Sequence, residues 1–256
     1  MIRLATGLAL LLIFALAGAA EAQSVPGIDR RFIRQAESPE DVVTTLEIVL
    51  LLTVLTLAPA ILVMMTSFTR IVIVLSFVRR ALATQELPPT QVIIGLALIL
   101  TTMVMMPTLV EIKDQALVPY IDGEISQKAA FERSLKPIRV FMFKHVHKQD
   151  LRLFIDIEQQ ALPLEKRKLP ATADDVGTHL LVAAFSISEL KRSFEMGFLL
   201  YLPFLIIDLV IASVLISMGM LVLPPILVSM PFKILLFVLV DGWHLIVGEI
   251  VGSFQT

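Results

Sequence analysis

The stretch "ISMGMLVLPP", from Ile216 to Pro225, joins two long apolar runs and decides where the chain folds back on itself. A connection between two hydrophobic segments is normally a polar turn exposed to water. This one has no charged residue: two methionines flank Gly219, and a double proline closes the stretch. The stretch therefore predicts the apex of a hairpin of two helices, with a flexible apolar bend from Gly219 to Pro225.

The two arms of this hairpin, residues 194–223 and 226–251, are the most apolar runs in the chain. One helix from Ser186 to Leu223 would be about 57 Å long at about 1.5 Å per residue, almost twice the hydrocarbon thickness of a bilayer. Such a helix has to bend, tilt steeply or extend beyond the bilayer, and Pro203 is the natural kink site.

The composition of the chain places it among membrane proteins. Hydrophobic residues make up 57% of its 256 residues and charged residues 17%, and the mean hydropathy is +0.86. An ordinary soluble domain is about half apolar or less. The formal net charge of -2 gives no support to nucleic-acid binding, and the lack of cysteine excludes disulfides, thiol catalysis and cysteine metal sites.

The N-terminal residues have the pattern of a cleaved secretory signal. Arg3 forms a short positive region, an apolar region runs from Leu4 to about Leu16, and small residues lead to Ala22. The apolar run is shorter than the roughly 20 residues that a membrane span needs, which favours a signal of residues 1–22 with Gln23 as the mature N-terminus. An uncleaved first anchor is the alternative.

Two further apolar runs, residues 42–65 and 92–110, lie in the N-terminal part of the mature chain, residues 23–110. Both are long enough to cross a membrane. The loop between them carries three arginines against one acid, so it belongs on the cytoplasmic side. With the two arms of the hairpin in residues 193–256, the sequence predicts four hydrophobic spans.

Residues 111–192 differ sharply from the apolar segments on either side. They hold 13 Lys or Arg and 12 Asp or Glu, with a helical spacing of apolar residues followed by a loop rich in helix breakers. The topology of the first two spans places this segment outside the cytoplasm. The predicted fold is therefore an all-α integral membrane protein with four hydrophobic segments, helical hairpins and a small helical extracytoplasmic domain.

Four acids stand inside apolar runs, where a charge is expensive and suggests a function. They are Glu47, Asp208, Asp241 and Glu249. A proton relay would pass protons along a line of such acids. The alternative, which we favour, is that they are paired, hydrogen-bonded or helix-capping groups, with Asp241 able to accept from the backbone near Gly242. They come from different segments, and no basic residue matches them at helical spacing.

The histidine pair in "KHVHK" has no support as a metal site. His145 and His147 are two residues apart, so a helix would not place them on one face, and a third ligand is missing. We expect both at the surface. His179 and His244 stand alone, and no serine stands in a Gly-x-Ser-x-Gly context. The sequence predicts neither a soluble-type enzyme nor a bound metal or cofactor.

Several residues are candidates for contacts between copies of the chain. In "SELKRSF", a glutamate and two basic residues could pair between copies, and the basic residues could equally be interfacial anchors. Phenylalanines of the charged domain could add apolar contacts. The candidates are Phe141, Phe143, Phe154, Glu189, Lys191, Arg192, Asp208 and Asp241.

Two blocks of the sequence are specific enough to indicate a family. The runs "SELK", "PFLIIDLV", "PFK" and "FVLVDGW" resemble the C-terminal signature of the FliP family of flagellar biosynthetic proteins, and "LAPAILVMMTSFTRIVIVLSFVRRAL" resembles the N-terminal half of that family. The resemblance covers nearly everything after Thr45. It implies a non-enzymatic core subunit of the flagellar type III export gate, in the bacterial inner membrane and the flagellar basal body.

The resemblance also implies partners. Members of the family form a ring of several copies with FliQ and FliR, guided by FliO, beside the export-gate proteins FlhA and FlhB. The ring passes unfolded flagellar proteins through a central pore. Its helices form hairpins, and the assembled complex is raised largely out of the membrane plane, although hydropathy predicts four spans.

A pore of this kind gives the apolar bend a use. In the family the loop often carries three consecutive methionines, whose flexible side chains can close a pore and deform around a passing polypeptide. Here Met220, Leu221 and Val222 stand at these positions, and Met218 precedes Gly219. The resemblance therefore implies a pore gasket formed by these five residues.

Two other classes of function stay open on the residues alone. A small-solute or proton-coupled transporter would use the intramembrane acids as its site, and an intramembrane enzyme would use an acid pair for catalysis. A transporter should move solute when it is reconstituted alone, and an enzyme should turn over substrate. An export subunit should purify in a ring with other small membrane proteins and be inert alone.

Overall fold

The computed structural model describes residues 39–84, 88–163, 167, 170–220 and 222–255, and every regular element in these ranges is helical. The all-α prediction is thus confirmed for this part of the chain. The predicted signal, with Ala22 and Gln23, and the gasket residue Leu221 lie outside the described residues. The described part divides into two compact units, residues 39–56 and 57–255.

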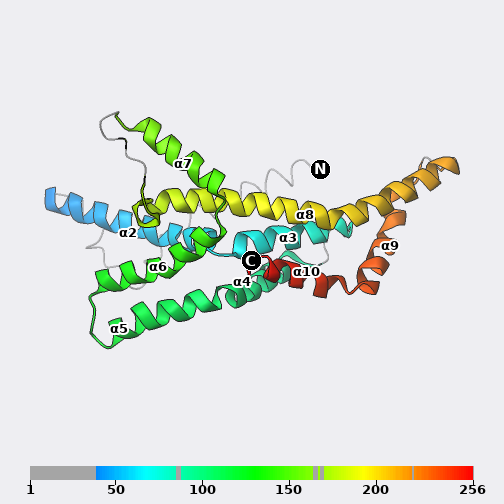
Figure 1. Cartoon of the computed structure of the whole chain (residues 1–256). Helices are drawn as coiled ribbons and strands as arrows, with labels where there is room; N and C mark the ends of the chain where they lie inside the picture. Colours follow the sequence, from blue (N-terminus) through cyan, green and yellow to red (C-terminus); the bar gives the residue numbers. More distant parts are fainter. Residues whose placement is uncertain (1–38, 85–87, 164–166, 168–169, 221, 256) are drawn as a thin grey trace, which may run out of the picture. The chain divides into compact units, whose positions relative to one another are not determined.

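The larger unit is built from helices of very different length (Figure 1). In chain order they are α3 (Phe68–Ala81), α4 (Thr90–Ile112), α5 (Val118–Ile121), α6 (Gln127–His145), α7 (Lys148–Ala161), α8 (Thr178–Ser217), α9 (Pro225–Leu239) and α10 (Gly242–Gly252). A π-helical turn, η2 (Lys113–Leu117), joins α4 to α5, and a 3-10 turn, η4 (Ala173–Asp175), precedes α8.

The smaller unit is the N-terminal part of helix α2 (Pro39–Met64), which crosses the boundary between the units. Its apolar side chains are exposed, with Leu46 and Leu50 62% and 68% exposed. The hydroxyls of Thr53 and Thr56 each donate to the carbonyl four residues earlier, at 2.7 Å. These two polar groups are therefore satisfied within the helix itself, as an apolar environment requires.

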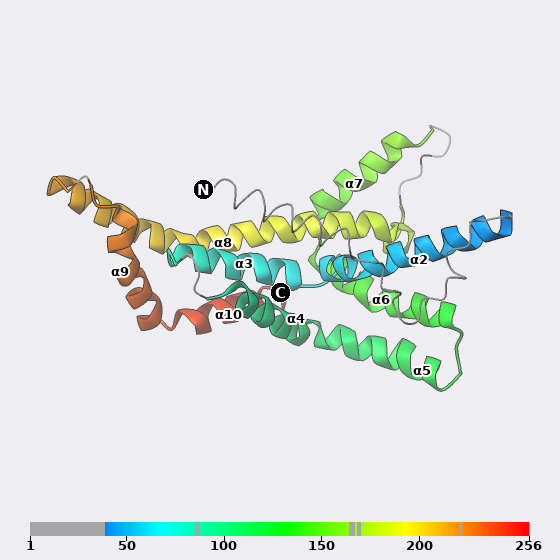
Figure 2. The same cartoon turned by 180° about the vertical axis from the view of Figure 1, so that it is seen from behind.

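The core of the larger unit forms where α3 packs along α8, and both views of the chain show these helices side by side (Figures 1 and 2). Helix α3 buries Ile71, Val74, Leu75 and Val78, the spacing of one helix face. Helix α4 packs on α3 as well. The short helix α3 is thus surrounded by longer ones, which explains how its arginine-rich sequence forms part of a core.

The hairpin predicted from Gly219 to Pro225 is confirmed, because α8 ends at Ser217 and α9 begins at Pro225. Helix α8 has 40 residues and continues through Pro203, so the expected kink site does not end it. The returning arm is broken instead, with α9 and α10 bent by 67°. At the break Asp241 has a left-handed backbone with φ 51°, through which a helix cannot continue.

The charged region contains two helices, α6 and α7, where the sequence indicated helical spacing. Ser126 caps α6 by accepting a hydrogen bond from Ala129 N at 3.3 Å. Helix α6 packs on α4, η2 and α8, and α7 packs on α8. The charged helices therefore share their core with the apolar ones.

Two helical stretches among the described residues are long and apolar enough to cross a membrane, Thr90–Ile121 and Thr178–Ser217. Helices α9 and α10 would make a third if the bent pair counts as one span. Four spans are not confirmed by this finding. The span at residues 42–65, and the side of the membrane on which the charged helices lie, stay predictions.

Candidate functional site

The tip of the hairpin is held by a defined helix end. Gly219 N donates to Ile216 O at 3.0 Å and Met220 N donates to Leu215 O at 2.9 Å, which together form a Schellman motif. Gly219 has a φ of +74°, a conformation that favours glycine. The glycine therefore fixes the place where α8 ends, whereas the sequence indicated a flexible bend.

The apolar side chains of this loop make few contacts within their own chain. Met218 is 66% exposed, Met220 39% and Val222 96%. Soluble proteins rarely leave a contiguous group of large apolar side chains open to water. Met218, Met220 and Val222 are thus available to lipid or to another protein chain.

An ion pair joins the two arms of the hairpin below this loop. Lys233 Nζ donates to Asp208 Oδ2 at 2.6 Å, and Ser229 Oγ donates to Asp208 Oδ1 at 2.5 Å. The Lys233 side chain is 1% exposed and the Asp208 side chain 30%. The structure shows the pairing favoured for these acids at Asp208, and the partner comes from the opposite arm, not from a helical spacing.

The other three acids of the apolar runs have no such partner among the described residues. Asp241 precedes α10 and is exposed, and its side chain makes no capping hydrogen bond, so the expected bond to the backbone near Gly242 is not formed. Glu47 and Glu249 are also exposed. Pairing of these acids with another chain stays a prediction.

One turn of α8 carries the densest polar network among the described residues. Glu189 accepts hydrogen bonds from Arg70 of α3, and both side chains are fully buried. Ser188 Oγ lies 2.7 Å from Asp150 Oδ2, and Arg192 Nε donates to His147 Nε2 at 3.1 Å. This turn therefore joins α3 and α7 to α8 within one chain.

The network bears on three predicted contact residues. Lys191 is exposed, whereas Glu189 is occupied by Arg70 and Arg192 by His147. A role of Glu189 or Arg192 between copies stays a prediction, and it would have to compete with these internal bonds. Arg70 was not predicted as a site residue, because it was counted only as one of the three arginines that orient the loop between two spans.

The prediction that the histidines lie at the surface is wrong for His145, which is 3% exposed. Its ring packs against Phe141 and Phe254, with ring centroids 4.8 Å and 5.3 Å apart. Burial, followed by nearby positive charges of which Arg70 is the strongest, lowers the pKa of His145 from 6.5 to about 4. The ring is therefore neutral near pH 7. Among the described residues no group of three His, Asp or Glu side chains could hold a metal ion.

The three predicted contact phenylalanines face the core of their own chain to different degrees. Phe141 is 8% exposed, while Phe143 and Phe154 are partly buried against the core. Phe143 also lies 5.5 Å from the guanidinium of Arg139. The exposed aromatic side chain of these helices is Phe131, at 65%.

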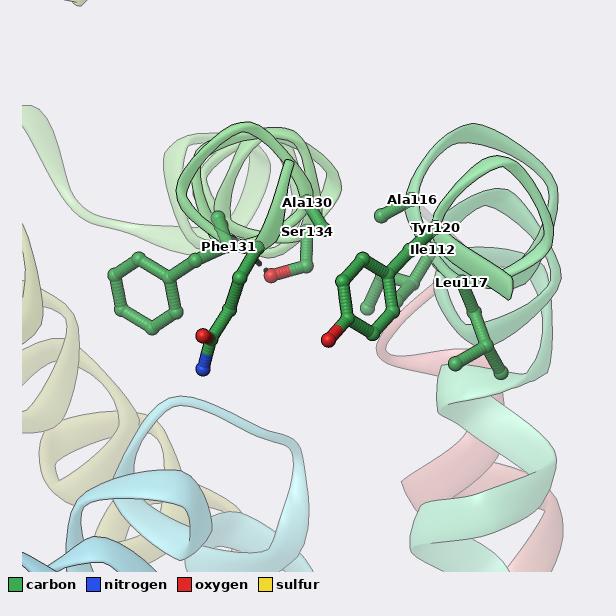
Figure 3. A pocket seen from close by; sticks show the side chains of 8 residues that line it. Ile112, Ala116, Leu117, Tyr120, Ala130, Phe131 and Ser134 are labelled. Atoms are coloured by element: carbon green, nitrogen blue, oxygen red, sulfur yellow. Dashed lines mark hydrogen bonds between the residues drawn. The ribbon is translucent and has the colours of Figure 1, made fainter. Parts of the chain in front are cut away.

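Phe131 borders a pocket of about 280 Å³ between α6 and the segment from α4 to α5. Figure 3 shows the ring of Tyr120 between the two walls, with Ile112, Ala116 and Leu117 on one side and Phe131 on the other. The lining is almost entirely apolar and holds no acid, base or nucleophile other than hydroxyls. The pocket is therefore better suited to binding apolar side chains than to catalysis.

These features define a class of protein. The described chain is helical, has helices long and apolar enough to cross a membrane, and ends its longest hairpin in an exposed apolar loop. Its buried charges are paired within the chain. Such helices and such an exposed loop are typical of a membrane-associated protein.

Comparison with known proteins gives the family. The FliP family matches residues 51–250 of this chain, and the chain therefore belongs to it. Flagellar biosynthetic protein FliP of Bacillus subtilis (strain 168) is 52% identical over 222 residues, which cover 87% of this chain and 97% of the relative. The protein of the same name from Treponema denticola is 43% identical over 234 residues, covering 91% and 84%. That from Aquifex aeolicus is 47% identical over 215 residues, covering 84% and 88%. The resemblance found in the two sequence blocks is confirmed.

Proposed function

We propose that this chain is a core pore-forming subunit of the flagellar type III protein export gate, passing unfolded flagellar axial proteins across the bacterial inner membrane. Membership in the FliP family, whose relatives are named flagellar biosynthetic proteins, carries the proposal. The exposed apolar loop at the tip of the α8–α9 hairpin gives it a physical mechanism.

The mechanism requires the loops of several copies to meet on one axis. Met218, Met220 and Val222 would then fill the lumen with apolar volume, and a narrow apolar lumen excludes water and ions by dewetting. Methionine side chains are unbranched and deformable, so the same seal can yield to a passing chain. No enzymatic step and no cofactor are part of this mechanism.

The assembly that we propose is a ring of several copies in the flagellar basal body, together with FliQ and FliR. FliO would assist its assembly, and FlhA and FlhB would complete the export gate. The extensive exposed apolar surface of α8 supports contacts with further chains or lipid; Leu199 and Ile206, for example, are 64% and 61% exposed. For contacts between the charged helices of neighbouring copies, we favour the pocket beside Phe131 over Phe141. The side chain of Phe141 is already buried in the core of its own chain.

The proposed topology includes removal of residues 1–22 as a secretory signal. Intact-mass measurement of the membrane-extracted protein should then give a mature chain that starts at or near Gln23. A chain that retains Met1 would contradict this part of the proposal and require a new topology.

The transporter alternative is not favoured. A proton or solute site in a membrane needs an acid that is free to change its charge or partner. Asp208, the most enclosed of the four acids, is neutralised by Lys233 and also accepts from Ser229. This arrangement is that of a structural pair.

The gasket is tested by removing apolar volume from the loop. Met220→Ala, alone or with Val222→Ala, should assemble in normal yield but let small ions through the membrane and slow growth, while export persists. Met103→Ala, the same truncation at an exposed methionine of α4, is the matched control and should not leak. Normal assembly without added conductance in the loop variants would remove the gasket mechanism.

A further inference from the structure

Arg70 is the most completely bonded charged side chain among the described residues. Its Nε donates to Glu189 Oε2 at 2.8 Å, and its Nη2 donates to the other carboxylate oxygen. Its Nη1 donates to Ser253 O at 3.1 Å and to Ser253 Oγ at 2.8 Å. The guanidinium also lies 3.8 Å from the ring centroid of Phe254. One fully buried side chain thus joins α3, α8 and the end of α10.

A buried ion pair is a poor way to gain stability, because desolvating both charges offsets most of their attraction. What an arginine supplies is direction. The planar guanidinium holds a carboxylate with two parallel hydrogen bonds and still has donors for a third group in the same plane. A lysine at this position could donate to Glu189 or to Ser253, but its compact ammonium group could not orient both partners at once.

The contact with Ser253 lies at the C-terminal cap of α10. The last carbonyls of a helix have no partner within the helix, and a cation is favourable there because of the helix dipole. Arg70 supplies both the hydrogen bond and the positive charge. The end of α10 is therefore attached to a fixed point on α3 and α8.

This attachment matters because the arm from α9 to α10 is not a continuous rod. It is bent by 67° at Asp241, and the side chains around the bend are exposed, with Leu239 and Trp243 74% and 41% exposed. Polar contacts hold this arm at two places: Lys233 bonds to Asp208 nearer the tip, and Ser253 bonds to Arg70 at the far end. Phe237, Ile246 and Ile250 also bury this arm against the core, but apolar packing is not directional, so the two polar contacts are what define its position.

We infer that Arg70 is a positioning residue, which fixes the returning arm α9–α10 against α8 by clamping Ser253 to Glu189. Through α9 and its Lys233–Asp208 pair, the same clamp holds Met218, Met220 and Val222 in a defined position. The second step rests on the proposed gasket function. The first step concerns the chain alone and can be tested by itself.

The position of the arm can be measured with spin labels, because the chain has no cysteine of its own. Cysteines replacing the exposed Lys191 of α8 and Glu249 of α10 would carry the labels in the full-length protein, with labelled copies diluted by unlabelled ones. The unmodified clamp should give one narrow distance distribution. Arg70→Lys should broaden it and shift it to longer distances. Arg80→Gln, which changes an exposed arginine on the same helix, should leave it unchanged.

A second variant separates positioning from stability. Arg70→Met combined with Glu189→Met replaces the ion pair by apolar side chains of similar size, which proteins often tolerate without loss of stability. The double variant should keep its thermal unfolding temperature and still show the broadened distribution. A narrow, unshifted distribution in this variant or in Arg70→Lys would overturn the positioning role.

Membrane conductance then tests the link to the loop. If Met220→Ala leaks, Arg70→Lys should leak as well, and an Arg70→Lys protein with a displaced arm but no added conductance would overturn the link. If neither variant leaks, the gasket mechanism itself fails, while the distance measurement still decides the positioning role.

Discussion

Asp208 and Lys233 illustrate how unequal the two members of one ion pair can be. Lys233 is almost completely buried, while Asp208 keeps 30% of its side chain exposed and a second partner in Ser229. Removing Asp208 would leave a buried positive charge without compensation, whereas removing Lys233 would leave an acid that can still be solvated.

We therefore expect Asp208→Asn to cost about 2–3 kcal/mol of stability and to cost more than Lys233→Met. The combined variant Asp208→Asn with Lys233→Met should recover most of the loss, because no unpaired charge remains. Thermal unfolding in detergent measures both effects, with the exposed Glu249→Gln as control. Equal losses in the two single variants would contradict this account of the pair.

His145 predicts how stability depends on pH. Its pKa in the folded chain is about 4, below the ordinary value of 6.5, so the unfolded chain binds the proton more readily. The contribution of His145 to the free energy of unfolding is then fully present above pH 6.5. It decreases as the pH drops from 6.5 towards 4, by up to about 1.4 kcal/mol per pH unit. His145→Phe should flatten this part of the profile, since an aromatic ring fits between Phe141 and Phe254. Phe131→Leu, which changes an exposed aromatic side chain on the same helix, should not. An unchanged slope in His145→Phe would contradict the assignment.

At the scale of the helices, the contact between α3 and α8 depends on a glycine. A Cβ atom added to Gly197 would lie 2.5 Å from Phe77 Cδ2 and 2.6 Å from Phe77 Cγ. These atoms are close to the backbone of α3 and cannot swing away easily.

We expect Gly197→Ala to cost about 1–3 kcal/mol by overpacking. Adding Phe77→Leu should restore part of the loss, because the clash is with the aromatic ring. Gly248→Ala is the matched control, since nothing lies within 4 Å of a Cβ atom there. The ranking of the three thermal unfolding temperatures checks this prediction, and a Gly197→Ala protein as stable as the Gly248→Ala protein would refute the close contact.

The helices also show which parts of the fold a sequence can predict. The apex of the hairpin could be predicted because a glycine and a double proline interrupt an otherwise uniform apolar run. The break between α9 and α10 was missed because apolar residues continue on both sides of it, and the dipeptide Asp241-Gly242 was the one local turn signal.

The polar contacts were harder to predict for a different reason. Arg70 and Glu189 are 119 positions apart, so no helical spacing relates them. The pair of Asp208 and Lys233 had a usable signal: both stand at nearly equal distances along the chain from Met220, and an antiparallel hairpin brings such positions level. The exposure of the loop residues could not be predicted from their apolar character. It depends on where α8 ends, and the structure places that end at Ser217.

At the scale of the whole molecule, the long apolar helices pose the question of where the chain lies relative to lipid. Helices Thr90–Ile121 and Thr178–Ser217 can each cross a bilayer by length and composition. The family resemblance implies that the assembled gate stands largely out of the membrane plane. The two statements agree if a single chain inserts first and leaves the lipid as its apolar faces meet those of its neighbours.

The single tryptophan of the chain can distinguish these states. Trp243 is 41% exposed on α10, beside the bend of the returning arm. In the full-length chain reconstituted alone, lipids brominated in their acyl chains should quench its fluorescence strongly, since the side chain would face hydrocarbon. In the assembled gate the quenching should fall, because other chains cover α10 or lift it out of the bilayer. A Trp243→Phe protein gives the background, and a water-soluble quencher reports whether the side chain has become exposed to water or covered by protein. Equal lipid quenching in both states would mean that assembly leaves the returning arm in lipid, and the expectation from the family resemblance, that the gate stands largely out of the membrane plane, would then be wrong for this chain.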